Sequence, residues 1–284
     1  EYNLKLLEEG FDRISVFIDE TKKMCRVCRR INKLTKGAIL KAVNSEEFEK
    51  KSYGDVVSIS YPAAISAKHI DLVKWAKAGP PYDARKAGVN LAKLAGNSNV
   101  LICLGSQKFS EDFIKGYLLR QYNFREYKTR KDAKSISTTL MLNRPSNLKK
   151  SIDEIRATVD GVFFTRDLVN EPANILTTTE FSKRLQKLSS LGVEVEVLEE
   201  KQLSDLGMNA LLGVGQGSAN PSKVVVMSWK GGAKSVQPLA LVGKGVVFDT
   251  GGISLKPAGG MEEMTMDMGG AGVVAGTMLA LAKR

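Results

Sequence analysis

The sequence holds few of the residues that build the commonest metal and disulfide sites. It has one histidine, His69, so a histidine-rich zinc site is excluded and a Ser-His-Asp triad would have to use that residue. Its three cysteines, Cys25, Cys28 and Cys103, are too few for a disulfide framework. We interpret them as thiols in a reducing compartment, although Cys25 and Cys28 have the C-x-x-C spacing of a redox pair or half a zinc site. Metal chemistry must therefore use oxygen ligands or an unusual donor.

Long apolar runs are also missing. No stretch is long and apolar enough to predict a membrane span, and the N-terminus shows no basic-then-apolar signal pattern. These two features favour a cytoplasmic protein with no membrane partner.

Acidic residues are scarce in the first half of the chain. Residues 1–150 carry 29 Lys+Arg and 16 Asp+Glu, a net charge of +13, whereas residues 151–284 carry 13 and 15, a net charge of −2. Basic residues gather in 21–36 and 125–134, which suits a phosphate-binding surface such as a DNA-binding face. A solvated face that keeps the protein soluble has the same composition, and aromatic residues are not interleaved as in a stacking platform.

At 284 residues the chain is long enough for about two domains, and we predict two α/β domains. Strands expected at 13–20, 54–61 and 99–105 alternate with helices at 69–79 and 84–96, which indicates a smaller N-terminal domain with a largely parallel sheet. His69 is then expected on a partly exposed helix. We place the domains at 1–140 and 141–284, with a linker helix near 151–170.

The second domain repeats the alternation of helices and strands, and we expect a mixed sheet in it. Thr177 and neighbouring threonines can cap the first helix, and Gly192 can end it. The expected elements are helices at 177–192 and 201–218 and strands at 193–199, 223–231 and 238–250.

Polar residues interrupt the last apolar run, "PLALVGKGVVFDTGG". Lys244 stands between two glycines and Asp249 ends the run. A charged lysine inside a core strand is costly unless it is paired or deprotonated. Three explanations stay open: a Lys244–Asp249 salt bridge, a lysine that reaches solvent, or two ligands of a divalent metal. A lysine ligand must be neutral, which costs roughly 4–5 kcal/mol at neutral pH, and a tightly held zinc ion can supply about 10 kcal/mol.

Two further charged residues lie close behind. Asp267, in "MTMDMGGAG", is a third candidate ligand where a glycine-rich helix begins. Lys256, in "ISLKP", is expected on a loop, and a charged lysine beside a metal can stabilise the oxyanion formed when water attacks a carbonyl.

The segments "VGKGVVFDTGGISLKP" and "MEEMTMDMGGAG" resemble the leucyl aminopeptidase (cytosol aminopeptidase) family of two-metal exopeptidases. The agreement extends upstream through "RDLVNEPANILTTTEF" and "VVVMSWKGG", so that residues 110–284 look like family sequence. The resemblance implies removal of N-terminal amino acids, leucine favoured, from peptides with a free N-terminus. It also implies two divalent ions (manganese, zinc or magnesium) and a homohexamer.

The resemblance gives each site residue a role. It implies that Lys244, Asp249 and Asp267 are metal ligands, with Asp249 bridging the two ions. It further implies that Lys256 is the catalytic lysine and that Met264 lines the pocket for the substrate's first side chain.

One part of the family pattern has no match in this chain. The family's "NTDAEGR"-type motif supplies further metal ligands and a catalytic arginine, and it belongs beyond Arg284. We therefore expect the chain as printed to be inactive. Two alternatives stay open: a DNA-binding accessory protein, since some bacterial members of the family bind DNA, and an inactive paralogue kept for assembly.

Overall fold

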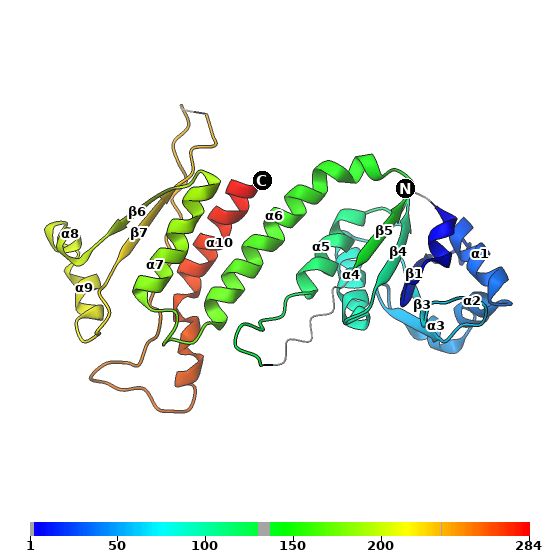
Figure 1. Ribbon diagram of the computed structural model, residues 1–284, viewed down its shortest axis with the longest axis horizontal. Helices are drawn as coiled ribbons and strands as arrows, with labels where there is room; N and C mark the ends of the chain where they lie inside the picture. The colour runs from blue at the N-terminus through cyan, green and yellow to red at the C-terminus, as the bar shows by residue number, and fades with distance from the viewer. Residues whose placement is uncertain (1–2, 130–136, 234) are drawn as a thin grey trace. The chain divides into compact units, whose positions relative to one another are not determined.

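The computed structural model describes residues 3–129, 137–233 and 235–284 and divides into two compact units, Glu1–Ile155 and Arg156–Arg284. The division falls inside helix α6 (Pro145–Asn170, Figure 1), which begins earlier than the linker helix expected from 151. The first unit is thus the longer one in this chain. Residues 130–134 of the basic segment 125–134 lie outside the described residues.

The first unit is built on a five-stranded mixed sheet with strand order β2-β3-β1-β4-β5. β1 pairs in parallel with β3 and β4, β4 pairs in parallel with β5, and only β2 runs antiparallel to its neighbour. The α/β class and the largely parallel sheet predicted from the sequence are confirmed. The strands are β1 (Arg13–Ile18), β2 (Val56–Ser60), β3 (His69–Lys74), β4 (Val100–Gly105) and β5 (Thr138–Leu142).

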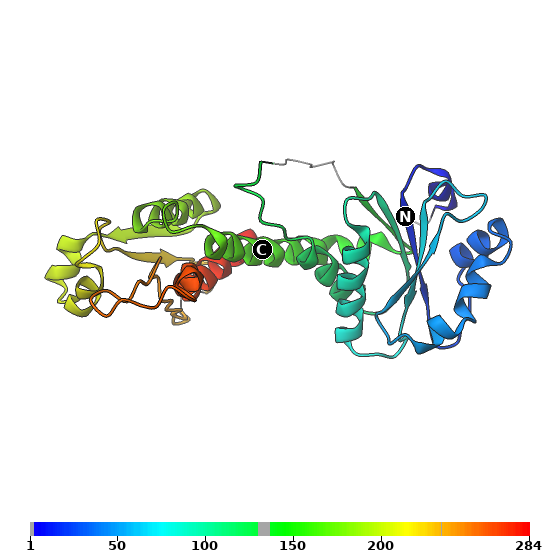
Figure 2. The same cartoon turned by 90° about the horizontal axis from the view of Figure 1, so that it is seen from below.

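Helices cover both faces of this sheet (Figure 2). One face packs against the first three α-helices in a core that includes Ile31, Ile39 and Phe48. On the other face Phe17 of β1 makes edge contacts with Trp75 and with Phe113 of α5. The helices are η1 (Leu4–Glu8), α1 (Arg26–Leu34), α2 (Ala38–Val43), α3 (Glu46–Lys50), α4 (Pro81–Ala95) and α5 (Ser110–Arg120).

A buried ion pair lies across the middle of the sheet. Arg13 of β1 contacts Asp71 of β3 through two hydrogen bonds of 2.9 and 2.7 Å, and Ser58 of β2 donates to the same carboxylate at 2.6 Å. Paired, bidentate charges are the form in which a sheet interior tolerates them. Strands β1, β3 and the edge strand β2 are thereby tied together in one register.

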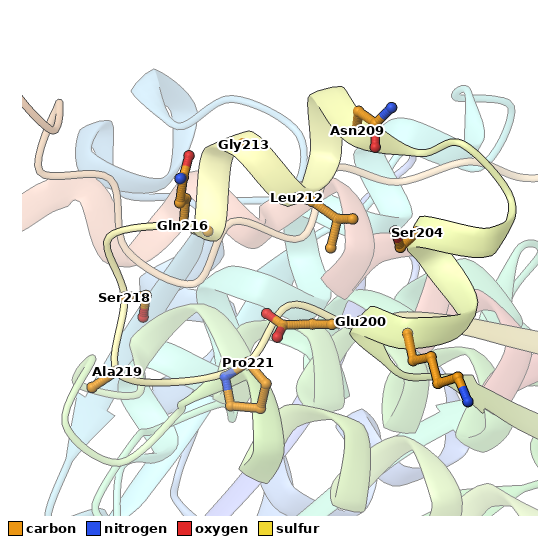
Figure 3. A pocket seen from close by; sticks show the side chains of 11 residues that line it. Glu200, Ser204, Asn209, Leu212, Gly213, Gln216, Ser218, Ala219 and Pro221 are labelled. Carbon is orange, nitrogen blue, oxygen red and sulfur yellow. The ribbon is translucent and has the colours of Figure 1, made fainter.

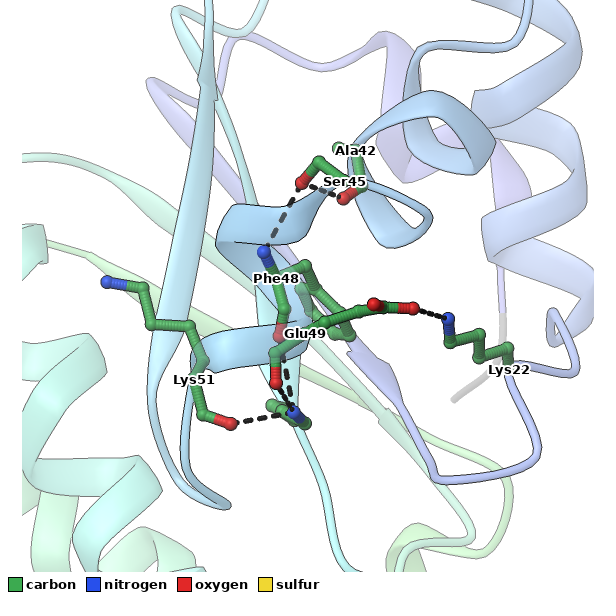
Figure 4. A network of polar contacts seen from close by, with 7 residues as sticks. Lys22, Ala42, Ser45, Phe48, Glu49 and Lys51 are labelled. Carbon is green, nitrogen blue, oxygen red and sulfur yellow. Dashed lines mark hydrogen bonds and ion pairs between the residues drawn. The ribbon is translucent and has the colours of Figure 1, made fainter.

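Lys74, at the end of β3, holds the C-terminus of α3 (Figure 4). Its Nζ donates to the carbonyl oxygens of Phe48, Glu49 and Lys51 at 3.2, 2.9 and 2.6 Å. The last carbonyls of a helix lack partners within the helix and favour a nearby cation. On the other side of α3, Lys22 donates to Glu49 at 2.9 Å.

The helix predicted at 69–79 is wrong. Residues 69–74 form β3, which lies between β1 and β2 and is buried along most of its length. A strand buried on both faces reads as a continuous apolar run, and such a run also fits the spacing of a buried helix. His69 therefore lies on a strand, where its Nδ1 is 3.3 Å from the hydroxyl of Ser60.

The second unit packs the C-terminal half of α6, α7 and α10 with an antiparallel pair of strands, β6 and β7. Leu168, Phe181 and Ala275 share one core, and Thr165 of α6 donates to the carbonyl oxygen of Gly272 at 2.9 Å. The elements are α7 (Thr178–Gln186), η2 (Lys187–Leu191), β6 (Glu194–Leu198), α8 (Glu200–Asp205), α9 (Asn209–Gly215), β7 (Val224–Ser228), η3 (Met261–Met268) and α10 (Gly269–Lys283).

In this unit, capping residues in the sequence correctly predicted where helices begin and end. Thr177 caps α7 by accepting from the backbone N–H of Glu180, and Gly192 ends η2 in the left-handed conformation, as predicted. The helix expected over 201–218 is instead two helices, α8 and α9, separated at Gly207, whose φ of +73° breaks the run.

One helical run has the composition of a membrane span, contrary to the sequence-based expectation. Residues 261–283, which consist of η3 followed directly by α10, have a mean hydropathy of 1.2. Core helices of water-soluble proteins have the same length and composition but are mostly buried, whereas 28% of the most apolar window of this run is buried, and α10 packs on α6 where Gly276 lies against Gly161 and Thr165. This run alone gives no ground for a membrane partner.

Candidate metal centre

The candidate site begins where residues 243–245 lie against the start of α10. The backbone N–H of Ala271 donates to the carbonyl oxygen of Lys244 at 2.8 Å. A Cβ on Gly243 would lie 2.4 Å from the carbonyl oxygen of Gly270, and a Cβ on Gly270 would lie 2.9 Å from the backbone nitrogen of Lys244. Only glycine allows this approach of two backbones. Lys244 is thereby held beside the junction of η3 and α10.

Lys244 forms an ion pair with Asp267 at that junction. The lysine Nζ lies 2.5 Å from Oδ1 of Asp267, and the lysine side chain is 58% exposed whereas the aspartate side chain is 17% exposed. The second carboxylate oxygen, Oδ2, is buried without a hydrogen-bond partner among the described residues. A buried acceptor without a partner is unfavourable by about 1–3 kcal/mol. The pair therefore presents a carboxylate oxygen that can take another positive ligand.

Asp249 and Lys256 make the second pair of the site. Oδ2 of Asp249 lies 3.1 Å from the Nζ of Lys256, and Oδ1 accepts from the backbone N–H of Gly251 at 2.8 Å. The loop closes on itself because the N–H of Lys256 donates to the carbonyl of Thr250 at 2.9 Å. The pKa of Asp249 is lowered mainly by the hydrogen bond from Gly251. Lys256 lowers it further, and the charge of Lys244 has the smallest effect of the three. Asp249 is therefore an ionised ligand candidate at neutral pH.

The structure thus brings the four charged residues together as two pairs. Lys244 is paired with Asp267, and its charge also acts on Asp249. The Lys244–Asp249 salt bridge, one of the three explanations left open, is not the pairing found; Lys256 takes that place. Met264 lies half-buried on η3, one turn before Asp267. The ligand roles of these residues remain predictions.

The residues fit a divalent ion by the chemistry of their donors. Carboxylate oxygens with one amine nitrogen suit manganese or zinc better than a soft metal. Such an ion would bind the unpartnered Oδ2 of Asp267. It would also bind the carboxylate of Asp249, whose lowered pKa keeps it ionised. The set is small: within the described ranges, no group of three or more His, Cys, Asp and Glu side chains could hold an ion.

The strand expected over 238–250 is wrong. The second unit's described sheet consists of β6 and β7, and residues 237–246 form neither strand nor helix. Leu239, Val242 and Ile253 are 86%, 95% and 108% exposed. The apolar run has the composition of a buried strand, but a strand also needs hydrogen-bonding neighbours.

A separate hollow lies over α8 and α9, away in sequence from these pairs (Figure 3). It has a volume of about 620 Å³. Glu200 points into it and accepts from the backbone N–H of Ser222 through Oε1 at 2.8 Å, which ties that loop to the start of α8. None of the predicted site residues lines this hollow, and sequence reasoning did not point to it. The lining residues are Glu200, Lys201, Ser204, Asn209, Leu212, Gly213, Gly215, Gln216, Ser218, Ala219 and Pro221.

Comparison with known proteins gives the class to which this chain belongs. Residues 163–284 match the catalytic domain of the cytosol aminopeptidase family. A probable cytosol aminopeptidase of Dinoroseobacter shibae is 49% identical over 272 residues, covering 96% of this chain and 56% of the relative. One from Cereibacter sphaeroides is 45% identical over 282 residues, covering 99% of this chain and 58% of the relative. The chain belongs to the cytosol aminopeptidase family.

Solved structures agree with this assignment. The bottromycin maturation enzyme BotP, in complex with Mn, matches 95% of this chain and 56% of its own with a TM-score of 0.70 and 25% identity. A mutant of tomato leucine aminopeptidase matches 98% of this chain with a TM-score of 0.78 and 23% identity, which supports the fold. The chain spans a little over half the length of the relatives it matches.

Proposed function

We propose that the protein to which this chain belongs is a two-metal aminopeptidase of the cytoplasm that removes N-terminal residues, leucine favoured, from peptides. Membership of a family of peptidases supports the class of reaction. The observation that carries the metal is Asp267, which pairs with Lys244 through one oxygen and keeps the other buried and unpartnered. A relative solved with manganese supports that ion as one candidate, and zinc and magnesium are the others.

In this proposal Lys244, Asp249 and Asp267 hold the ions. When bound, a pair of divalent ions polarises a carbonyl and supplies a nucleophilic water at neutral pH. Lys244 must release Asp267 and lose its proton to become a ligand, and its exposed ammonium can pass that proton to solvent. Asp249 needs no such step, because its lowered pKa keeps it ionised.

Lys256 is the residue that we propose acts on the substrate. Its ammonium, 3.1 Å from Asp249, is a positive charge beside the proposed ligands. A fixed cation at the point where negative charge develops stabilises the transition state. We propose that Lys256 binds the carbonyl oxygen of the scissile bond, and that Met264 contacts the substrate's first side chain.

The test uses the full-length gene product and a peptide with an N-terminal leucine, with its α-amine free or acetylated. We expect release of leucine from the free peptide only, loss of activity after EDTA treatment and recovery on adding manganese. Cleavage of the acetylated peptide at the same rate would reject the aminopeptidase proposal. A full-length protein that binds manganese but cleaves neither peptide would favour the alternative of an inactive paralogue. Assembly as a homohexamer stays a prediction, which sedimentation of the full-length protein would test.

DNA binding is a second candidate, supported by the net charge of +13 over residues 1–150. Part of that charge is already paired, as in Lys22–Glu49, Lys68–Asp12 and Arg85–Asp112. Binding by the remaining charge would act through counterion release and weaken steeply as salt rises. A gel-shift titration at physiological salt tests it, and the absence of a retarded band at micromolar protein would reject it.

A further inference from the structure

Cys25 and Cys28 form a pair at the start of α1, in the first unit and outside the candidate metal centre. Cys25 is the N-cap of this nine-residue helix, and its Sγ accepts from the backbone N–H of Cys28 at 3.3 Å. The two Sγ atoms lie 3.1 Å apart. This is a hydrogen-bond distance, about 1 Å longer than a disulfide bond, so a movement of about 1 Å by one side chain would join them.

The two thiols lie in different surroundings. Cys25 is exposed, whereas Cys28 is fully buried beside Val27 and Ile31 in the core of the first unit. A hydrogen bond from the Cys28 thiol, followed by the backbone N–H groups of Cys28 and Val27, lowers the pKa of Cys25 to about 6. The charge of Arg29 acts in the same direction. The hydrogen bond to Cys25 and burial raise the pKa of Cys28.

Neither a zinc site nor a structural cap explains this arrangement. The third cysteine, Cys103, is buried in β4, and no three metal-ligating side chains gather in the part of the chain that the structure describes. A helix cap needs only one acceptor, and serine, threonine or asparagine serves better than cysteine. An exposed thiol with a buried partner thiol behind it is instead the arrangement of an attacking and a resolving cysteine.

We propose that Cys25 and Cys28 are a thiol–disulfide exchange site that reacts with low-molecular-weight disulfides of the glutathione class. The Cys25 thiolate attacks one sulfur of the disulfide, forms a mixed disulfide and releases one thiolate. The Cys28 sulfur then attacks the Cys25 sulfur and displaces the second thiolate, which takes the proton of the Cys28 thiol. Two protein thiols are oxidised to one disulfide, and one glutathione disulfide is reduced to two glutathione thiols.

The experiment equilibrates the reduced, purified protein in buffers with stepped ratios of reduced to oxidised glutathione. Acid quenching and N-ethylmaleimide then block the remaining thiols. Trypsin cleaves after Lys23, Arg26 and Arg29, so Cys25 and Cys28 fall on two separate peptides. We expect those peptides to lose the label together and to appear as one disulfide-linked species as the buffer becomes more oxidising. Glutathione bound to Cys25 in the wild type, without that linked species, would overturn the proposal, as would full labelling at the most oxidising ratio.

Three variants separate the roles of the cysteines. In Cys28→Ala the mixed disulfide with glutathione should accumulate on Cys25, because nothing resolves it. In Cys25→Ala the buried Cys28 should stay labelled by maleimide, with no adduct. Cys103→Ala is the matched control and should leave the transition of the wild type unchanged. If a core variant fails to fold by circular dichroism, the wild-type measurement still decides the proposal.

Discussion

Gly243 and Gly270 meet backbone to backbone, and this contact holds Lys244 beside Asp267. A Cβ on Gly243 would lie 2.4 Å from the carbonyl oxygen of Gly270. The two residues come from a loop and from the first turn of α10, and the hydrogen bond from Ala271 to Lys244 continues the contact. The geometry of the candidate site therefore depends on two positions that carry no side chain.

Replacing Gly270 with alanine should push the loop away from α10, because the new Cβ would lie 2.9 Å from the backbone nitrogen of Lys244. A displacement of about 1 Å at a catalytic site lowers activity by about 100-fold. We expect that loss for Gly270→Ala in the full-length enzyme, measured as kcat/KM on leucine-p-nitroanilide. Gly269→Ala is the matched control, since a Cβ there meets nothing within 4 Å. Equal activity of the two variants would show that the backbone contact does not position the site.

Asp267→Asn should weaken metal binding. The change keeps the size of the side chain but removes the charge that pairs with Lys244, and it replaces one of the two carboxylate oxygens with an amide nitrogen that cannot bind the ion. Even residues that only support a ligand change metal affinity by about 10–100-fold, so losing a carboxylate ligand should reduce manganese affinity by about 100-fold or more. Isothermal titration of the metal-free protein measures it. Asp160→Asn, which removes the exposed pair with Lys283, should bind as the wild type does. Unchanged affinity of Asp267→Asn would remove this residue from the ligand set.

Lys74→Met should destabilise the first unit without affecting the candidate site. Three carbonyl oxygens at the end of α3 would lose their donor. Hydrogen bonds to charged groups contribute about 1.5–3 kcal/mol when buried, and this ammonium is part-exposed, so we expect about 1–3 kcal/mol in urea unfolding. Lys77→Met, an exposed lysine three residues later, is the control. A urea midpoint for Lys74→Met equal to that of Lys77→Met would contradict the stabilising role of Lys74 at the end of α3.

The rate at which Cys25 reacts with iodoacetamide should show that its pKa is lowered. Because the pKa is lowered to about 6, the thiolate is present above that pH and is lost as the pH falls through it. The rate should level off near pH 7, whereas that of glutathione keeps rising. At pH 6 the larger thiolate fraction outweighs the weaker nucleophile, so Cys25 should react about tenfold faster than glutathione. Cys28→Ala removes the hydrogen bond and should move the profile to higher pH. A wild-type profile like that of glutathione would contradict the assigned environment.

The sequence predicted the elements whose signals are local. Thr177 and Gly192 mark the ends of a helix through their own backbone bonds, and β1, β4, β6 and β7 follow apolar or alternating runs. β3 was missed because a strand buried between two others has no polar face to show its period of two. The strand predicted at 238–250 was wrong for the opposite reason. The composition of this run suits a strand, but a strand forms only by pairing with distant residues that the run itself does not contain.

The candidate site was predicted only in part. The family resemblance named Lys244, Asp249, Lys256 and Asp267, and composition alone would have suggested a Lys244–Asp249 pair. The pairing found, Lys244 with Asp267 and Lys256 with Asp249, is set by the contact of Gly243 with Gly270 and by the loop turn at Gly251. Such contacts between backbones leave no trace in hydrophobic periodicity, so they required the structure.

We propose that Lys244, Asp249 and Asp267 form one part of a two-ion site that the full-length protein completes. Hydrolysis of leucine-p-nitroanilide with manganese added tests it most directly, by comparing the chain as printed with the full-length gene product. A site that lacks one of its two metal ions loses several kcal/mol of transition-state stabilisation, and each 1.36 kcal/mol lost lowers the rate about tenfold. We predict turnover by the full-length protein and none measurable by the 284-residue chain, which should still bind manganese weakly. Comparable turnover by the two proteins would contradict the account.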